Sequence, residues 1–404
     1  MKIAIMGFGT VGKGAYEVAK TAGDIEVKRI LARHGAEGYE DLDGIITADI
    51  ADIAGDADIE LVVESIGGIE PARTYVLECL NAGKHVVTPN KNLISACYKE
   101  LTEAAEANGV ELRFTPSVGG GIPWLHNLQR TKRCDVIEEV RGIVNGTCNY
   151  ILDSMTESGA DFGEMLAGAQ ELGYAEADPS ADIEGTDTLR KTVISANLAF
   201  DSAVSEEDVP CFGIDSVSAS DVEYLKSEGR VLRLHMKAAR NVDGITAYVE
   251  PTAFPASAME ASVRLNNNLV TLMAEDIGTQ SFYGQGAGMY PTGESVVQDI
   301  LDIRDGIRQN AAKGVVDDES GANASKGAAN ETGGLKVNND FAIHKYYVRV
   351  DDLADDIKGI AESADEIDGR YHCITEPISV TEMHALARKY KENGKEIFIA
   401  GLAD

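Results

Sequence analysis

Three glycines with the spacing G-x-G-x-x-G follow a short apolar stretch in the N-terminal sequence MKIAIMGFGTVGKGAYEVAK. The stretch Lys2 to Met6 predicts a strand, and Val11 to Lys20 predicts a helix. This order is required in a dinucleotide-binding unit. The first glycine allows the turn, the second lets backbone approach a pyrophosphate, and the third lets the helix pack on the strand. We therefore expect a Rossmann-type α/β domain whose cofactor contacts Gly7, Gly9, Thr10, Val11 and Gly12.

Further apolar segments alternate with predicted helices through the first third of the chain. The segments are Ile25–Arg33, Ile59–Gly68, Lys84–Ser95 and Val110–Pro123. This alternation predicts a doubly wound parallel sheet over residues 1–131, completed by about 285–310. Ligands of such sheets bind at the carboxyl ends of the strands, which here include Ser65 and Lys91.

The end of the second strand bears on the choice of cofactor. An acidic residue at this place holds the ribose 2′-hydroxyl of NAD, whereas an arginine suits a 2′-phosphate. The residue here is Arg33, which favours NADP. No Lys or Arg occurs between Arg33 and Arg73, so NAD stays open as the alternative.

The rest of the chain predicts other units. Alternating segments such as Leu232–Ala238 and Gly244–Val249 predict antiparallel strands in an α+β domain over 132–284. Residues 311–340 contain almost no large apolar side chains and predict a flexible linker. Residues 341–404 predict a small ferredoxin-like module.

Charge and composition exclude several function classes. The net charge is −31, from 36 basic and 67 acidic residues, which disfavours nucleic acid and anionic membranes as partners. No apolar run is long enough to span a bilayer and no signal-peptide pattern is present, so we expect a cytoplasmic protein. The six cysteines and seven histidines are scattered, which argues against a disulfide framework or a zinc hydrolase.

Seven separated motifs together resemble the homoserine dehydrogenase family over most of residues 1–310. They are GFGTVGKG, GGIEPA, TPNKNLIS, SVGGGIP, GIVNGTCNYIL, GYAEADPSADIEGTD with Lys191, and GAGMYPT. The resemblance implies reversible reduction of aspartate 4-semialdehyde to homoserine with NAD(P)H, on the route to threonine and methionine. It also implies a homodimer formed through the second domain.

The same resemblance assigns roles to individual residues. Lys191 matches the acid/base, Glu176 and Asp187 match substrate-binding carboxylates, and Lys91 matches a second lysine between cofactor and substrate. The family's cofactor glycines correspond to Gly173, Gly286 and Gly288, and its Na⁺ or K⁺ site to the backbone carbonyls of Val118, Gly120 and Ile122. Two departures are visible: Thr115 stands where many relatives have glutamate, and DDLADDI (Asp351 to Ile357) replaces the Pro-Gly turn of an ACT-like regulatory domain.

The chemistry of the acidic segment agrees with these roles. Aldehyde reduction needs a proton donor near the carbonyl oxygen, and a lysine ammonium can also stabilise the developing alkoxide. Asp187 and Lys191 are spaced to share one face of a helix, and Lys91 could be a second cation nearby. Asp182 is a further candidate for binding the substrate ammonium.

Two other functions remain as alternatives. Aspartate-semialdehyde dehydrogenase acts on the same aldehyde but needs a thiolate nucleophile, and none of the cysteines has a convincing setting for one. A non-catalytic sensor of NAD(P) or an amino acid is the second alternative, suggested by the C-terminal module.

Overall fold

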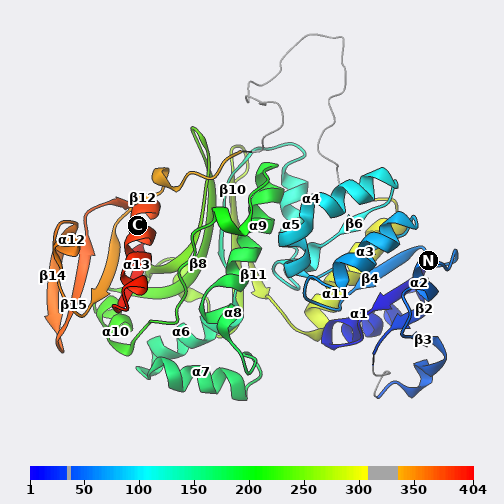
Figure 1. The fold of residues 1–404 in the computed structure, drawn as a ribbon, viewed down its shortest axis with the longest axis horizontal. Helices are drawn as coiled ribbons and strands as arrows, with labels where there is room; N and C mark the ends of the chain where they lie inside the picture. The colour runs from blue at the N-terminus through cyan, green and yellow to red at the C-terminus, as the bar shows by residue number, and fades with distance from the viewer. Residues whose placement is uncertain (34–37, 308–334) are drawn as a thin grey trace, which may run out of the picture.

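The computed structural model describes residues 1–33, 38–307 and 335–404. Figure 1 shows two halves, with the N-terminus at one end of the molecule and the C-terminal module at the other. No helix within the described residues is both long and apolar enough to cross a membrane. Residues 311–334 of the predicted linker lie outside these residues.

The N-terminal half is a parallel sheet of six strands in the order β3-β2-β1-β4-β5-β6. Its strands are β1 (Lys2–Met6), β2 (Glu26–Leu31), β3 (Ile46–Thr47), β4 (Leu61–Glu64), β5 (His85–Val87) and β6 (Leu112–Arg113). The order reverses beside β1, as in a doubly wound nucleotide-binding sheet. The predicted Rossmann-type domain is therefore confirmed.

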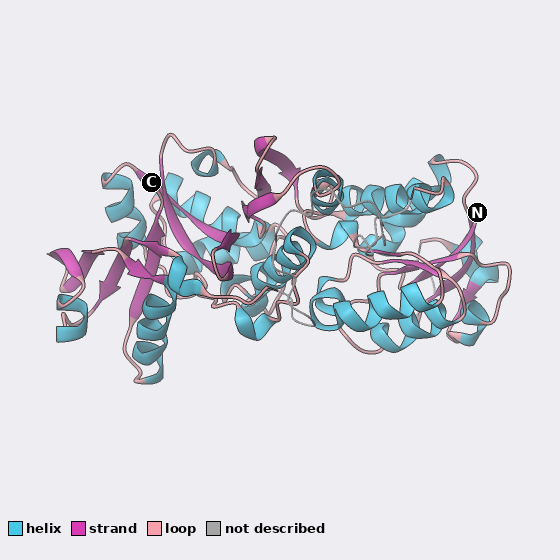
Figure 2. Cartoon of the chain, turned by 90° about the horizontal axis from the view of Figure 1, so that it is seen from above, coloured by secondary structure: helices cyan, strands magenta, loops and turns pink. Residues whose placement is uncertain are grey.

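Helices cover both faces of this sheet (Figure 2) because successive side chains of its strands point to opposite sides. Ile3 and Ile5 of β1 pack with helices α1 (Thr10–Thr21) and α11 (Met289–Arg304). Ala4 and Met6 belong to the core on the other face, with α3 (Ala72–Asn81) and α4 (Lys91–Ala107). Helix α11 therefore returns the chain from the second half to the first domain.

The second half is built on a mixed sheet of nine strands in the order β11-β10-β7-β8-β9-β17-β13-β15-β14. The strands of the middle domain are β7 (Ile137–Ile143), β8 (Arg230–Asn241), β9 (Gly244–Pro255), β10 (Asn267–Ala274) and β11 (Gly278–Gln285). Its helices are α6 (Gly146–Ser158), α7 (Phe162–Glu171), α8 (Ser180–Ile183), α9 (Thr186–Phe200) and α10 (Ala219–Ser227), and α5 (Trp124–Thr131) precedes them. The predicted α+β character of this domain is confirmed.

The C-terminal elements run β-α-β-β-α-β, with their strands in the antiparallel order β17-β13-β15-β14. They are β13 (Tyr346–Val350), α12 (Asp355–Lys358), β14 (Ala361–Ile367), β15 (Arg370–Thr375), α13 (Val380–Glu392) and β17 (Ile397–Leu402). A short pair, β12 (Ile343–His344) and β16 (Ile378–Ser379), lies beside them. Strand β17 pairs in parallel with β9, so the sheet of this module continues the sheet of the middle domain.

Residues 335–340, the last part of the predicted linker, are attached to the middle domain. The amide of Ile245 donates to the carbonyl of Lys336 (3.0 Å), and the amide of Asn338 donates to the carbonyl of Ile245 (2.8 Å). The side chain of Asn339 accepts from the amide of Ala247 (2.8 Å). These backbone groups of β9 would otherwise be unpaired, which explains why this segment is held in place.

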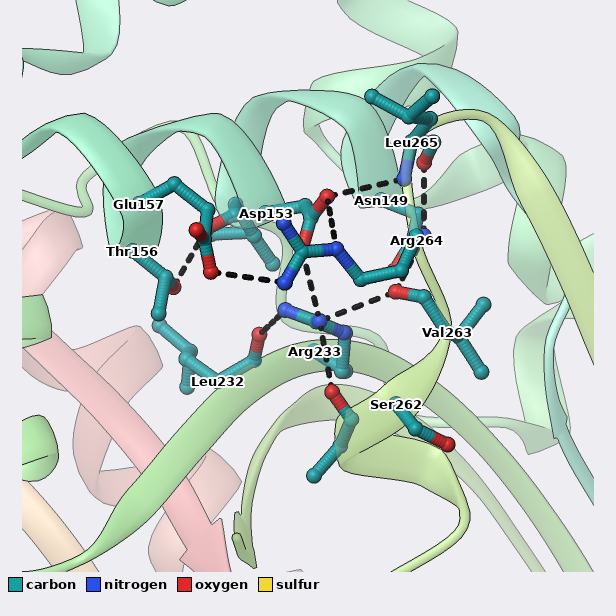
Figure 3. A network of polar contacts seen from close by, with 12 residues as sticks. Asn149, Asp153, Thr156, Glu157, Leu232, Arg233, Ser262, Val263, Arg264 and Leu265 are labelled. Atoms are coloured by element: carbon teal, nitrogen blue, oxygen red, sulfur yellow. Dashed lines mark hydrogen bonds and ion pairs between the residues drawn. The ribbon is translucent and has the colours of Figure 1, made fainter.

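A buried ionic network fixes α6 to β8 (Figure 3). The guanidinium of Arg233, 1% exposed, donates to Asp153 (3.1 Å) and to the carbonyls of Ala261 and Val263 (both 3.0 Å). The other carboxylate oxygen of Asp153 accepts from the amide of Leu265 (2.9 Å). Each buried charge of the network has a partner, and these contacts fix the position of α6 relative to β8.

A second buried carboxylate joins the C-terminal module to the middle domain. Glu250 of β9, 1% exposed, contacts His344 (2.9 Å), His384 (2.8 Å) and the hydroxyl of Tyr346 (3.0 Å). Burial by itself raises the pKa of Glu250, but the hydrogen bonds from the two histidines lower it to about 2. The ionised form is therefore stabilised by contacts made only in the folded chain.

We expect Glu250→Gln to lower the free energy of unfolding at neutral pH by about 1.5–3 kcal/mol, the usual effect of losing hydrogen bonds to a buried charged group. The stabilisation is present above the unfolded-state pKa, about 4.3, and is lost as the pH falls toward the folded-state value of about 2. Urea unfolding should show that the difference in unfolding free energy between Glu250→Gln and wild type becomes smaller as the pH falls through this window. Glu362→Gln, which breaks an exposed pair with Lys345, is the matched control and should change little. An equal effect of both substitutions would contradict the role of Glu250.

Candidate active site

The glycine turn between β1 and α1 has the geometry that the sequence predicted. Gly7 has a φ of +91°, and a β-carbon at Gly12 would lie 2.2 Å from the carbonyl oxygen of Gly7. Ser65, at the end of β4, donates its hydroxyl to the same carbonyl (2.8 Å). A β-carbon at Gly9 would meet no atom within 4 Å, so open space lies in front of this residue.

This turn is suited to a dinucleotide phosphate. Gly9 caps α1 and offers no side-chain oxygen to the first amides of the helix. Such amides, together with the helix dipole, bind anions without requiring basic side chains. Arg33 is exposed just after β2 and borders residues 34–37, which lie outside the described part.

A second cluster forms where α4 and α9 meet, between the two halves of the molecule (Figure 1). The ammonium of Lys191 donates to Asp187 Oδ2 (2.7 Å) and to the carbonyl of Val144 (2.6 Å). The ammonium of Lys91 lies 2.9 Å from Asp187 Oδ1. One carboxylate thus bridges two lysines, one from each half.

Local structure explains these positions. Asn90 ends the loop after β5 and caps α4, accepting from the amide of Leu93 (3.2 Å), so that Lys91 is the first residue of the helix. Asp187 lies in the first turn of α9, where a negative charge is favoured by the helix dipole. Lys191 follows one turn later on the same face.

The surroundings of Asp187 shift its ionisation. Burial raises its pKa, but the charges and hydrogen bonds of Lys191 and Lys91 outweigh burial and hold the pKa well below the usual range. The charge of Asp187 in turn raises the pKa of Lys91, more than burial lowers it. The carboxylate is ionised and Lys91 is a cation at neutral pH.

Asp182 and Asn145 complete the cluster. The side-chain amide of Asn145 donates to Asp182 Oδ1 (2.7 Å) and to Asp187 Oδ2 (2.8 Å). Burial, and then the neighbouring charge of Asp187, raise the pKa of Asp182. Asn145 was not predicted as a site residue, because Asn-Gly is a common turn signal. An asparagine directly before a predicted helix is also typical of a helix cap.

Two predicted residues lie apart from this contact network. Glu176 is exposed between α7 and α8, and its side chain makes no hydrogen bond or ion pair to the cluster within the described residues. Gly173 is exposed in the same segment, with a φ of +73°. The hydroxyl of Thr147 donates to the carbonyl of Tyr174 (2.6 Å), which ties this segment to the start of α6.

The segment Val118–Ile122 packs against the late glycines. A β-carbon at Gly120 would lie 2.5 Å from the carbonyl carbon of Gly286, and one at Gly286 would lie 1.5 Å from Asn268 Oδ1. Gly288, with a φ of +122°, caps α11. Glycine is therefore required at each position, and the two motifs meet at the junction of the domains.

A buried carboxylate lies next to the segment proposed to bind a cation. Asp299 of α11 accepts from the amide of Thr115 (3.1 Å), and burial raises its pKa to about 7. The hydroxyls of Thr115 and Ser117 are buried and have no hydrogen-bond partner among the described residues. The carbonyl of Ile122 accepts from the amide of Trp124 (2.7 Å).

The cysteines do not provide a nucleophile for acyl chemistry. Cys148, the one beside the cluster, is buried and donates to the carbonyl of Asp182 (3.1 Å), and burial raises its pKa well above the usual value. A thiolate, the form needed for attack, is disfavoured there. This setting argues against an acyl-forming dehydrogenase.

Taken together, a phosphate-binding glycine turn and a lysine–carboxylate cluster beside the same sheet define a dinucleotide-dependent oxidoreductase. The model of the homoserine dehydrogenase NAD-binding domain matches residues 7–115, and that of homoserine dehydrogenase matches 123–301. The chain belongs to the homoserine dehydrogenase family, and it is an enzyme that binds a nicotinamide dinucleotide.

Individual relatives agree with this assignment. The homoserine dehydrogenase of Corynebacterium glutamicum is 41% identical over 314 residues, which are 74% of this chain and 71% of the relative. That of Synechocystis sp. is 40% identical over 323 residues, 75% and 73% of the two chains.

Solved structures give the same result. The crystal structure of a homoserine dehydrogenase from Thiobacillus denitrificans has a TM-score of 0.84 and 29% identity, and covers 100% of this chain and 98% of that one. A hyperthermophilic archaeal homoserine dehydrogenase in complex with NADPH shares the fold, with a TM-score of 0.67 and 22% identity over 76% of this chain and 98% of that one.

Proposed function

We propose that this chain reduces L-aspartate 4-semialdehyde to L-homoserine, reversibly, with Lys191 as the proton donor and acceptor. The observation that carries the proposal is the pair of acceptors around its ammonium. An ammonium has three hydrogens, and the carbonyl of Val144 and the carboxylate of Asp187 each accept one. The third hydrogen remains for the aldehyde oxygen.

The nicotinamide, when bound, supplies the hydride that goes to the aldehyde carbon. Lys191 gives its proton to the oxygen, and its charge stabilises the alkoxide as it forms. The lysine is then neutral and recovers its proton from solvent. In the reverse direction it accepts the proton of the alcohol.

Lys91 has a role in charge balance in this scheme. When Lys191 becomes neutral, the buried Asp187 would lose its counterion if it had only one. Lys91, whose ammonium lies 2.9 Å from Asp187 Oδ1, remains as a second counterion. Because an uncompensated buried charge is costly, this second counterion keeps Asp187 paired while Lys191 gives up its proton.

The substrate ammonium requires a carboxylate that is not already engaged. Asp187 is committed to Lys91, Lys191 and Asn145, so its part in substrate binding is mainly to orient these groups. Asp182 accepts from Asn145 through Oδ1 (2.7 Å) but forms no ion pair with a lysine or arginine among the described residues. We assign the ammonium to Asp182 and Glu176, with the exposed Glu176 approaching when substrate binds.

The cofactor is held, in this proposal, by the glycine turn and the residues that face it. The pyrophosphate binds at Gly7, Gly9, Thr10, Val11 and Gly12, and Ser65 keeps the turn in place through Gly7. Gly173, Gly286 and Gly288 border the nucleotide, and Lys91 lies between nucleotide and substrate. Arg33 binds the 2′-phosphate of NADP.

A monovalent cation, Na⁺ or K⁺, is proposed at the carbonyls of Val118, Gly120 and Ile122. Glutamate is absent at Thr115, and the buried Asp299 beside it is the carboxylate that could balance the charge. The buried hydroxyls of Thr115 and Ser117, which lack partners in the described part of the chain, are further oxygen donors.

We further propose that residues 132–284 form a homodimer interface and that 341–404 are a regulatory module. The module contacts residues 212–214, which in turn contact α8. Lys391 of α13 lies over the ring of Phe212, 4.3 Å from its centroid. The amide of Ile214 donates to the carbonyl of Ile183 at the end of α8 (2.7 Å). A ligand that shifts α13 could thus reach the α8–α9 turn.

We expect Lys191→Ala to lower kcat for aspartate semialdehyde by about 10²–10⁴-fold, the usual contribution of a positioned acid. Cofactor affinity, measured by the fluorescence of NADPH, should be nearly unchanged. Lys132→Ala is a matched control, because Lys132 also donates to a carbonyl (Leu198, 2.6 Å) and an aspartate (Asp201, 2.5 Å) at the other end of α9. Wild-type turnover in Lys191→Ala would reject the mechanism.

Initial rates with NADPH and NADH test the cofactor assignment. We expect NADPH to have the lower KM, and Arg33→Ala to raise the KM for NADPH by about tenfold, equivalent to 1.4 kcal/mol. The KM for NADH should change little, since NADH has no 2′-phosphate. An equal change for both cofactors would show that Arg33 does not read the phosphate.

A further inference from the structure

Asn145, the residue before α6, contacts Asp182 of α8 and Asp187 of α9 through its side chain. The side-chain nitrogen donates to Asp182 Oδ1 (2.7 Å) and Asp187 Oδ2 (2.8 Å), and the side-chain oxygen accepts from the backbone amide of Cys148 (2.8 Å). The side chain is 4% exposed. One residue therefore caps a helix and binds two carboxylates at the same time.

The contacts of Asn145 fix which way its amide faces. The cap requires an acceptor toward Cys148, and the carboxylates require donors toward Asp182 and Asp187. With the amide reversed, the oxygen would face two carboxylates and the nitrogen would face an N–H group. Both hydrogens of the amide are thus directed at the carboxylates.

We propose that Asn145 is a positioning residue, which sets the distance and orientation of Asp182 and Asp187 relative to Lys191. The inference rests on the function proposed above, since it assigns those carboxylates to substrate and catalyst. The backbone carbonyl of Val144, the preceding residue, accepts from the ammonium of Lys191. Val144 and Asn145 together therefore hold Lys191 and Asp187 in place.

The alternative is that Asn145 serves only as the cap of α6. Capping uses only the amide oxygen, whereas positioning uses the two hydrogens of the nitrogen. Two like charges also face each other across this nitrogen, and an amide donor between them offsets their repulsion. The two roles can therefore be separated by substitution.

Asn145→Ser separates them because serine caps helices as well as asparagine does but has one short hydroxyl in place of the amide. The experiment compares Asn145→Ser, Asn145→Ala and wild type in full-length enzyme. Thermal stability, affinity for NADPH and turnover with aspartate semialdehyde are measured for each. Ser218→Ala, which removes the cap of α10 far from the site, is the control for cap loss.

We expect Asn145→Ser to have a melting temperature close to wild type and an unchanged Kd for NADPH. Its kcat/KM for aspartate semialdehyde should fall by about 10–100-fold, because small misplacements of catalytic groups have effects of that size. Asn145→Ala should show the same fall together with lower stability. Ser218→Ala should lose stability but keep kcat/KM.

Wild-type kcat/KM in Asn145→Ser would overturn the inference and leave capping as the role of Asn145. Lys191→Ala, assayed in parallel, separates this failure from failure of the proposed function. If Lys191→Ala is inactive while Asn145→Ser is fully active, only the role of Asn145 is wrong. If Lys191→Ala is fully active, the proposed function and the inference built on it are both wrong.

Discussion

The carboxylate of Asp187 accepts from the ammonium groups of two lysines that belong to different halves of the chain. Lys191 is on its own helix, and Lys91 begins a helix of the nucleotide-binding sheet. This contact requires a fixed arrangement of the two halves, because a shift of α4 along α9 would separate Lys91 from the buried carboxylate of Asp187. It also holds Lys191, the proposed acid/base, next to the first residue of a helix of the nucleotide-binding domain.

Helix α9 carries this arrangement because it packs against both halves. Trp124 of α5 donates to Ser195 of α9 (3.0 Å), and Arg190 of α9 donates to Asn92 of α4 (3.2 Å). On its other side α9 lies on β7, β8 and β9, the sheet that the C-terminal module extends. The C-terminal module, the nine-stranded sheet and α9 are therefore parts of one continuous packed structure.

Much of this could be predicted from sequence where the determinants are local. The glycine spacing predicted the turn at Gly7 to Gly12, and the helical period placed Asp187 beside Lys191. The approach of Lys91 depended on tertiary packing and was proposed only through the family resemblance. Asn145 was missed because its bonds to Asp182 and Asp187 join residues far apart in sequence, and the same holds for the pairing of Val337 with Ile245 in the predicted linker.

Residues that act on a ligand are the hardest to place from the protein alone. Glu176 makes no side-chain bond to the cluster in the described residues, and Arg33 is exposed at the edge of the described region. Both are proposed to contact the substrate or the cofactor, and contacts of this kind form only when those molecules are bound. The cluster around Asp187, by contrast, is already formed by protein contacts.

The most direct test is the steady-state turnover of Asp187→Asn with aspartate semialdehyde and NADPH. Asparagine keeps the size of the side chain but removes the charge that holds Lys91 and Lys191 together. We predict a fall in kcat of at least about 10²-fold with the affinity for NADPH unchanged. Turnover within about twofold of wild type, a difference of only about 0.4 kcal/mol in the barrier, would contradict the account.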